Sequence, residues 1–293
     1  MVIPPQILNP NLLLKSSPLI TVIVAVFNGA KTLQQCIDSV ITQTYPDKEL
    51  IIIDGASKDG TVGLLEVNQE HINYWISEPD KGIYNAWNKV LSQANGEWIC
   101  FLGADDFFWN TQVLERVSIQ LQMIPPDIRV AYSQIVLLNK DGEALYPIGE
   151  PWGKIKDRFK QFMCIPHQGV MHRRSLFGQH GKFDESFRIA GDYELLMREL
   201  KTGDAVFIPD LITVGMRQGG ISSDPANTLV TMREFRLAQQ MHGQRLPSLI
   251  WLAAMARVYV RLLLWRILGE GVTRKVFDQY RRMRGLPSYW TKT

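Results

Sequence analysis

The stretch LITVIVAVFNG (residues 19–29) decides the first element of the fold. Its first eight residues are apolar or β-branched without a polar alternation, which is typical of a strand buried on both faces of a parallel sheet. A turn signal at Asn28-Gly29 follows, and residues 32–44 carry apolar side chains at helical spacing. A second apolar run, residues 50–53, ends at Asp54. This strand, helix and strand span about 35 residues, the size of a right-handed βαβ crossover.

Helices and strands continue to alternate along the chain, less regularly in its second half. Further helices are expected over residues 61–70, 83–94 and 193–201, and further strands over residues 72–76, 97–102, 130–138, 165–171 and 205–208. Asn139-Lys140-Asp141-Gly142 predicts a tight hairpin turn. After Ser223 the pattern is helical, with breaks at Pro247 and Gly269. The alternation favours the α/β class with a mostly parallel sheet.

Carboxylates follow three of the predicted strands at the point where each strand ends. They are Asp54, then Glu78 and Asp80, then Asp105 and Asp106. Ligands of open α/β sheets bind outside the carboxyl ends of the strands. The sequence therefore predicts several acids around one crevice.

The composition is that of an ordinary folded enzyme. The chain has 293 residues, of which 46% are hydrophobic and 21% charged, so disordered and collagen-like classes are excluded. The three cysteines, Cys36, Cys100 and Cys164, are widely spaced and odd in number, which favours reduced structural thiols over disulfides or a zinc site. The N-terminal stretch lacks the pattern of a secretory signal, and a cytoplasmic location is expected.

The net charge of +3 is unevenly distributed between the first 225 residues, which we call the body, and residues 226–293, which we call the tail. Residues 226–293 hold 12 Lys and Arg against 3 Asp and Glu, whereas the first 225 residues hold 20 against 26. Within the tail, three arginines interrupt the apolar residues 249–268, which disfavours a membrane-spanning helix. Residues 249–284 fit contact with an anionic membrane surface, at the inner face of the cytoplasmic membrane, or a helix packed on the catalytic domain with its arginines turned outward. Nucleic acid is not an expected partner, because no recognition motif accompanies the charge.

Asp105 and Asp106 are adjacent acids directly after a buried strand. Neighbouring carboxylates repel unless they share a cation or a hydrogen-bond network. Mg²⁺ and Mn²⁺ take oxygen ligands, commonly one or two carboxylates together with substrate phosphates. The alternative is a solvated loop in which an Asp caps a helix that begins at Phe107.

The remaining polar candidates also have structural alternatives. Asp54 could accept hydrogen bonds from a nucleotide or belong to a turn, and Asp192, after Gly191, is by position an N-cap of the helix that follows it. His167 is by itself a structural histidine, and Arg217 suits phosphate binding or a surface turn. No Gly-x-Gly-x-x-Gly and no Gly-Lys-Ser/Thr loop is present, which disfavours nicotinamide and P-loop chemistry.

Taken together, these segments resemble the family 2 glycosyltransferases. The matching segments, in the family's order, are residues 20–28, 51–61, 77–89, 96–106 and 183–195. The resemblance implies a GT-A fold, which is a Rossmann-like, open, mostly parallel sheet flanked by helices, here with a C-terminal helical extension. It divides the chain into an irregular lead-in (1–18), a catalytic domain (19–223, with a nucleotide-binding half over about 19–106 and an acceptor half over about 107–223), and a basic helical region (224–293).

The resemblance also implies roles for individual residues. Asp192 would be the catalytic base, and Asp54 and Asp80 would hold the nucleoside. Asp105 would coordinate a divalent metal, Mn²⁺ or Mg²⁺, with Asp106 beside it. Arg217 and His167 would contribute to donor binding. Gly103 departs from the family pattern, because many relatives carry the first Asp of an Asp-x-Asp motif there.

The implied reaction is an inverting transfer of a sugar from a nucleotide-diphosphate sugar, with a UDP-sugar favoured, to an acceptor hydroxyl. The acceptor would be a saccharide or lipid-linked molecule of cell-surface polysaccharide or glycolipid synthesis. Two other functions are compatible with the residues: a catalytically silent nucleotide-sugar-binding scaffold docked to a membrane, and a nucleotidyltransferase that releases pyrophosphate.

Overall fold

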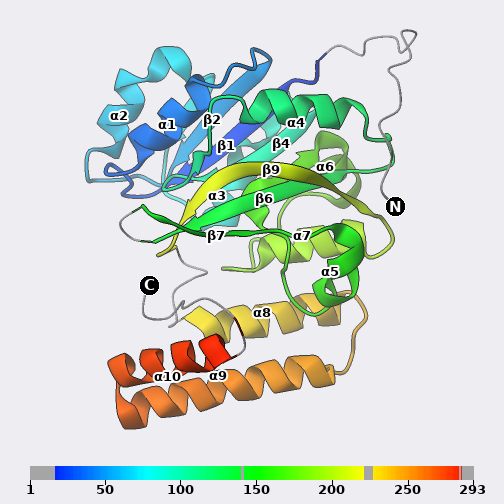
Figure 1. Ribbon diagram of the computed structural model, residues 1–293. Coiled ribbons are helices and arrows are strands. Elements are labelled where there is room, and N and C mark those ends of the chain that lie inside the picture. The colour runs from blue at the N-terminus through cyan, green and yellow to red at the C-terminus, as the bar shows by residue number, and fades with distance from the viewer. Residues whose placement is uncertain (1–16, 140–141, 221–226, 284, 286–293) are drawn as a thin grey trace.

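A nine-stranded sheet organises the molecule (Figure 1). The computed structural model describes residues 17–139, 142–220, 227–283 and 285. The strand order is β3-β2-β1-β4-β8-β6-β9-β5, and β7 pairs with β6 outside this path. The strands are β1 (Ile20–Val26), β2 (Lys48–Asp54), β3 (Tyr74–Ser77), β4 (Trp98–Gly103), β5 (Phe107–Phe108), β6 (Val130–Leu138), β7 (Ala144–Ile148), β8 (Val170–Arg173) and β9 (Ala205–Arg217).

The first four strands form the parallel half of the sheet, as the sequence predicts. Val22 on β1 lies beside Leu50 on β2 and Cys100 on β4. Successive residues of β1 serve opposite faces: Val22 packs in one hydrophobic cluster and Ile23 in the other, and both are fully buried. This burial on two faces is the reason for the continuous apolar run in the sequence.

Helices cover both faces of the sheet. They are α1 (Leu33–Ile41), α2 (Thr61–Val67), α3 (Ile83–Val90), α4 (Val113–Gln122), α5 (Trp152–Phe159), α6 (Arg174–His180), α7 (Gly191–Leu200), α8 (Thr228–Met241), α9 (Leu249–Leu268) and α10 (Glu270–Met283). Three short 3₁₀ helices are η1 (Gln69–His71), η2 (Leu91–Gln93) and η3 (His167–Gly169). Helices α1, α2 and α4 pack on one face, and α3, α5, α6 and α7 on the other.

From residue 107 onward the observed elements differ from the expected pattern in several places. The strand expected over residues 205–208 continues to Arg217, past an irregular pairing with β6 near Asp210, whose φ is 53°. The strand expected over residues 165–171 divides into η3 and β8. Phe107 lies in β5, so the expectation of a helix that begins there is wrong. The sequence pattern does not predict helices α4, α5 and α6 or strands β5 and β7.

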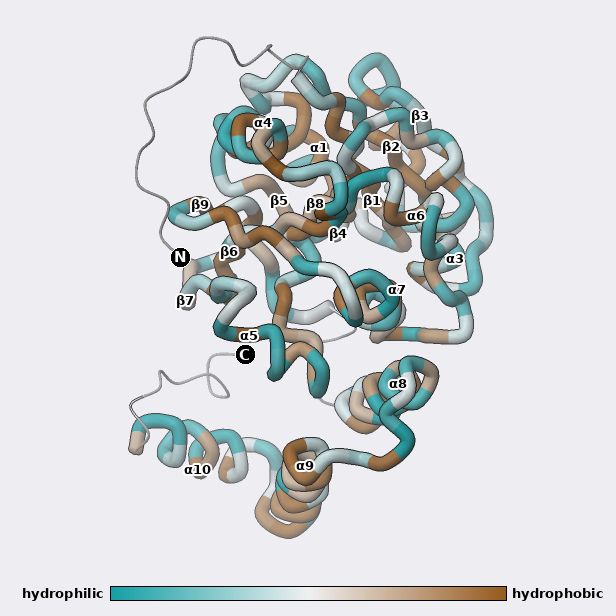
Figure 2. The backbone as a smooth tube through the Cα atoms, turned by 90° about the vertical axis from the view of Figure 1, so that its right-hand side faces the viewer, coloured by the Kyte–Doolittle hydropathy of each residue, from teal (hydrophilic) through white to brown (hydrophobic). Residues whose placement is uncertain are grey.

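The C-terminal helices form a layer below the sheet domain (Figure 1). Helix α8 belongs to the body of the protein, because Ala238 is fully buried in the cluster that holds α7. Helices α9 and α10 pack against each other beyond it, and Figure 2 shows α9 as a largely hydrophobic helix at the edge of the molecule. The predicted breaks are confirmed: α9 begins after Ser248 and ends before Gly269.

Some predictions fall on residues that the structure does not describe. They are the lead-in over residues 1–16, the centre of the turn at Lys140-Asp141, and the boundary at Ser223. Within the described ranges, no helix combines the length and the apolar character that crossing a bilayer requires.

Candidate functional site

A cleft of about 600 Å³ opens at the carboxyl ends of β1 and β4. Segments far apart in the sequence line it: Phe27 after β1, Asp105 and Asp106 after β4, Asp192 on α7, and Arg217 at the end of β9. His167 of η3 and Thr231 and Phe235 of α8 complete the wall. The cleft therefore brings Asp105 and Asp106 together with Asp192, whereas Asp54, Glu78 and Asp80, which the sequence also placed around the crevice, are not among its lining residues.

Asp105 and Asp106 form the acidic floor of this cleft. The Asp106 carboxylate is buried, and its Oδ1 accepts a hydrogen bond from the backbone N–H of Arg217 at 3.0 Å. Burial raises the pKa of both carboxyls, and the charge of Asp105 raises that of Asp106 further. A half-buried and a buried carboxylate with raised pKa values would be stabilised in their ionised forms by a bound cation.

These two acids fit a hard divalent cation that is shared with a ligand. Among the described residues, no group of three or more His, Cys, Asp or Glu side chains could hold a metal ion by itself. A cation here would take one or two carboxylate oxygens from the protein and the rest from water and substrate phosphates, which is the usual pattern for Mg²⁺. Asp105 and Asp106 are thus the residues that could hold it.

Asp192 lies in the first turn of α7 and lines the same cleft. Its Oδ1 accepts the backbone N–H of Tyr193 at 2.8 Å and lies 3.3 Å from the hydroxyl of Tyr84. Burial raises the pKa of Asp192 to about 6 and outweighs these hydrogen bonds, which lower it. Ala190 occupies the N-cap position, so Asp192 does not cap the helix.

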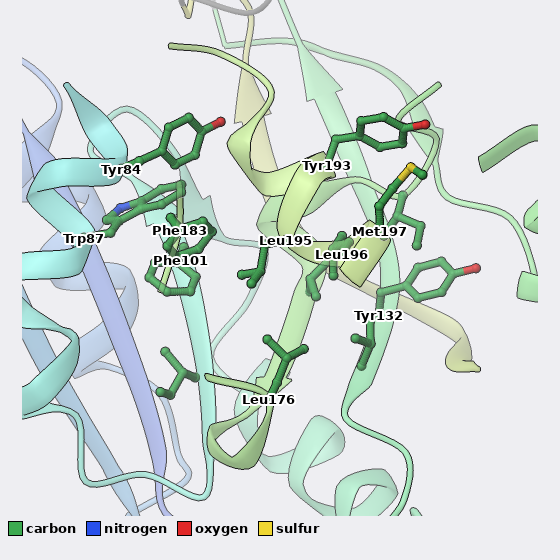
Figure 3. Packing of buried hydrophobic residues seen from close by; sticks show 14 of the residues in the cluster. Tyr84, Trp87, Phe101, Tyr132, Leu176, Phe183, Tyr193, Leu195, Leu196 and Met197 are labelled. Atoms are coloured by element: carbon green, nitrogen blue, oxygen red, sulfur yellow. The ribbon is translucent and has the colours of Figure 1, made fainter. Parts of the chain in front are cut away.

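Tyr84 of α3 supports this wall. Its hydroxyl lies 2.6 Å from the carbonyl oxygen of Ile189, and its ring packs edge-on to Trp87 and stacks with Phe183 (Figure 3). A Cβ at Gly191 would lie 2.8 Å from the Tyr84 ring, so only glycine lets the start of α7 approach so closely. This contact explains why Gly191 precedes Asp192.

His167 contributes a neutral imidazole to the cleft. The ring packs against both Trp87 and Phe101, at centroid distances of 5.5 and 5.9 Å, and the side chain is buried. Burial lowers the pKa of His167 to about 3. Its Nε2 has no hydrogen-bond partner within the described protein, so it can offer a ligand a hydrogen bond but not a positive charge.

Arg217 ends strand β9 and does not lie in a surface turn, which was one of the two alternatives from the sequence. Its guanidinium bonds to Gln35 and lies 5.7 Å from the centroid of the Phe107 ring, while its backbone N–H binds Asp106. Arg217 is therefore held beside the acidic floor as the nearest positive charge that lowers the pKa of Asp105.

Asp54 and Asp80 lie next to the cleft but do not line it. Asp54 is fully buried at the end of β2 and accepts hydrogen bonds from the Ser57 backbone and from the Ser77 hydroxyl at 2.6 Å. The Asp80 carboxylate lies close to Gly55, since a Cβ there would be 2.5 Å from its Oδ2. A Cβ at Gly55 would also lie 3.3 Å from the Phe27 ring, and Phe27 lines the cleft. Asp54 and Asp80 thus form an acidic corner that adjoins the cleft at Phe27.

Comparison with known proteins identifies relatives. Residues 21–176, more than half of the chain, match "Glycosyl transferase family 2". The chain is 29% identical over 190 residues to a "PGL/p-HBAD biosynthesis glycosyltransferase" of Mycobacterium bovis (strain BCG / Pasteur 1173P2), covering 62% of this chain and 70% of the relative. It is 31% identical over 202 residues to an uncharacterized glycosyltransferase of Mycobacterium tuberculosis (strain CDC 1551 / Oshkosh), covering 62% and 69%.

Solved structures share the fold at low sequence identity. S. aureus TarS 1-349 in complex with UDP-GlcNAc has a TM-score of 0.60 and 19% identity, over 75% of this chain and 66% of that one. A mannosyltransferase from Pyrobaculum calidifontis, in complex with GDP-Man and Mn²⁺, has a TM-score of 0.53 and 17% identity, over 86% and 83%. The chain belongs to glycosyl transferase family 2 and is a glycosyltransferase with the GT-A fold.

Proposed function

We propose that the protein transfers a sugar, with inversion, from a nucleotide-diphosphate sugar to an acceptor hydroxyl. The observation that carries the proposal is that Asp192 faces the same cleft as Asp105 and Asp106. Inversion requires a base on the side of the sugar opposite the leaving group. Asp192 on α7 and the acidic pair after β4 come from separate elements that line one cleft, which supports separate roles as base and as donor-binding group.

Asp192 is the general base of this mechanism. As the acceptor oxygen bonds to the anomeric carbon, its proton passes to a carboxylate oxygen of Asp192, and the bond from the anomeric carbon to the diphosphate oxygen breaks. A pKa of about 6 leaves Asp192 ionised at neutral pH and able to take the proton. The hydrogen bond from the Tyr193 backbone holds the carboxylate in place.

The other cleft residues bind the donor. A divalent cation, Mn²⁺ or Mg²⁺, held by Asp105 with Asp106 beside it, would supply positive charge for the leaving diphosphate. Arg217 adds a fixed cation next to these acids, and His167 a neutral hydrogen-bonding group. Asp54 and Asp80, in the adjoining acidic corner, hold the nucleoside. A UDP-sugar is the favoured donor, and TarS was solved with UDP-GlcNAc.

The acceptor is a saccharide or lipid-linked molecule of cell-surface polysaccharide or glycolipid synthesis. The mycobacterial relative is named for PGL/p-HBAD biosynthesis, which supports this class of acceptor. An acceptor of that kind is presented at a membrane.

The helices α9 and α10 attach the enzyme to the anionic surface of that membrane. Leu263 and Ile267 of α9 and Val276 of α10 are 57, 66 and 44% exposed. Helix α9 contains no acidic residue, and the basic side chains of Arg266 and Lys275 are exposed beside the apolar ones. Exposed apolar stripes next to positive charge are complementary to an anionic headgroup layer and the acyl chains below it.

Replacement of the base tests the mechanism. Asp192→Asn should lower sugar transfer by about 10²- to 10⁴-fold, while the Kd of the nucleotide sugar stays within twofold, because the amide keeps the shape of the side chain. Asp157→Asn, on the exposed surface of α5, is the matched control and should keep the wild-type rate. Rates and the released nucleotide are measured by chromatography.

Three results would contradict the proposal. Wild-type turnover by Asp192→Asn would remove this residue from the reaction. Release of pyrophosphate instead of a nucleoside diphosphate would favour a nucleotidyltransferase. Donor binding by the wild-type protein without transfer or hydrolysis, across donors and acceptors, would favour a silent binding scaffold.

A further inference from the structure

The side chain of Glu234, on α8, binds the backbone immediately before α7. Its two carboxylate oxygens accept hydrogen bonds from the N–H groups of Arg188, Ile189 and Ala190, each at 2.8 Å. Three backbone donors on one carboxylate leave little freedom in the segment that they belong to. Asp192 follows this segment after a single glycine.

The same segment is held from its other side by α3. The Tyr84 hydroxyl, 2.6 Å from the Ile189 carbonyl oxygen, also lies 3.3 Å from Asp192. Residues 188–190 are therefore clamped between a hydroxyl of α3 and a carboxylate of α8. The placement of the Asp192 carboxylate depends on both.

Helix α8 is itself fixed against α7. The rings of Phe235 and Tyr193 lie 4.9 Å apart, and His242 Nε2 lies 3.0 Å from a carboxylate oxygen of Glu194. Phe235 also lines the cleft. The helix that carries Glu234 thus forms part of the wall in which the base sits.

We infer that Glu234 is a positioning residue, which holds the segment before α7 and thereby the place of Asp192. This inference rests on the proposed function, because it gives Asp192 the role of base. A misplacement of about 1 Å can cost about 100-fold in rate, so loss of the clamp should lower kcat more than donor binding.

The charge of Glu234 also affects the pKa of Asp192. The negative charge of Glu234 disfavours the ionised form of Asp192 and so contributes to its raised pKa. The titratable groups that act on Asp192 from neighbouring elements are Tyr84 on α3 and Glu234 on α8, while Glu194 of its own helix pairs with Arg198 and His242. Removal of the Glu234 charge should therefore move the acid limb of the kcat profile to lower pH.

Two variants of Glu234 distinguish its positioning of Asp192 from the effect of its charge on Asp192. Glu234→Gln removes the charge and part of the accepting capacity, so kcat should fall by about 10- to 100-fold with the acid limb moved to lower pH. Glu234→Asp keeps the charge but is one methylene too short to span three N–H groups, so kcat should fall while the acid limb stays in place. Arg233→Gln, one residue away and exposed, is the control and should change neither.

The measurements are kcat and the donor KM from pH 5 to 8, with thermal unfolding to verify that each variant is folded. Wild-type kcat and an unmoved acid limb in both Glu234 variants would overturn the inference. A Glu234→Asp variant with full kcat would overturn the positioning role even if Glu234→Gln failed to fold. Full activity of Asp192→Asn would instead reject the proposed function, so the two failures are distinguishable.

Discussion

Gly103 shows how one missing side chain shapes the acidic floor. A Cβ at this position would lie 2.6 Å from Asp106 Oδ2 and 2.9 Å from Asp105 Oδ1. The glycine thus lets both carboxylates fold back over the end of β4, in the place where an acid of the Asp-x-Asp motif stands in many similar proteins. Asp106 cannot move away at low cost, since it is buried and bonded to the Arg217 backbone.

We therefore expect Gly103→Asp to damage the site, although it restores the family motif. A third carboxylate would displace Asp106 and add negative charge where two buried acids already have raised pKa values. Donor affinity in the presence of Mn²⁺ should fall by about tenfold or more, which is about 1.4 kcal/mol. Isothermal titration with the nucleotide sugar measures it. Gly103→Ala, which adds volume without charge, should show a smaller loss, and tighter donor binding by Gly103→Asp would refute the expectation.

The raised pKa of Asp192 predicts the pH dependence of the enzyme. The base works only when ionised, and its pKa is about 6 because the carboxyl is buried. As pH falls below that value the protonated fraction rises, so kcat should fall about tenfold per pH unit and level off above about pH 7. Initial rates at saturating donor and acceptor test this, with circular dichroism as a control for folding. A kcat that stays constant down to pH 4.5 would contradict the assignment of Asp192 as the base.

At the scale of single residues, the sequence predicts those acids that directly follow a strand. Asp105 and Asp106 can be predicted because they directly follow a buried strand, and Asp192 because the family resemblance implies its role. Tyr84 and Glu234 are not visible, since they act through contacts that span more than 40 residues of sequence and look like ordinary helix positions. Gly191 is a sequence signal for the close approach of Tyr84, but its meaning becomes clear only when the partner ring is known. No comparable signal marks Glu234.

At the scale of elements, predictability follows the regularity of burial. Strands β1, β2 and β4 are buried on both faces and therefore read as continuous apolar runs. Strand β9 is mixed in burial and contains Pro209-Asp210, so only its first four residues follow a strand pattern, yet it pairs with β6 over most of its length. Tertiary pairing, rather than local sequence, decides that strand.

Helix α8 shows the same limit at the domain boundary. From the sequence it belongs to the basic tail, but Ala238 and Phe235 pack on α7 and Thr231 lines the cleft. The catalytic unit of the structure thus extends past the boundary at residue 223. Of the α-helices in the described ranges, α9 and α10 contribute no residue to either hydrophobic cluster of the sheet domain.

Across the whole molecule, the positive charge and the exposed apolar residues of α9 and α10 lie apart from the acidic cleft. The excess of Lys and Arg lies in the tail, whereas the acids that form the cleft lie in the body. Helix α9 contacts α8, where the Trp251 indole N–H donates to the Met232 carbonyl oxygen at 3.3 Å, and Arg281 of α10 lies beside the Tyr146 side chain of β7. Attachment through α9 and α10 would therefore hold the cleft at a fixed distance from a surface that carries the acceptor.

This arrangement predicts binding to vesicles that depends on lipid charge. The 293-residue chain should sediment with vesicles of phosphatidylglycerol mixed with phosphatidylcholine, less with phosphatidylcholine alone, and less at high salt. The double variant Arg266→Glu/Lys275→Glu should bind the anionic vesicles at least about 30-fold more weakly, because each basic residue near the surface contributes about 1 kcal/mol. Lys154→Glu/Lys201→Glu, the same charge change on exposed residues of the body, should bind like the wild type.

The exposed apolar residues of α9 require a separate variant, because positive charge alone can also cause binding to anionic vesicles. Leu263→Asn/Ile267→Asn should weaken the salt-resistant part of the binding while leaving hydrolysis of the donor unchanged, because neither residue lies near the cleft. If these exposed residues instead form a contact between two copies of the chain, sedimentation without lipid will show a wild-type dimer that the variant dissociates, and anionic vesicles will not compete with it. That result would reject membrane attachment through α9 and α10 and leave the chemistry of the cleft untouched.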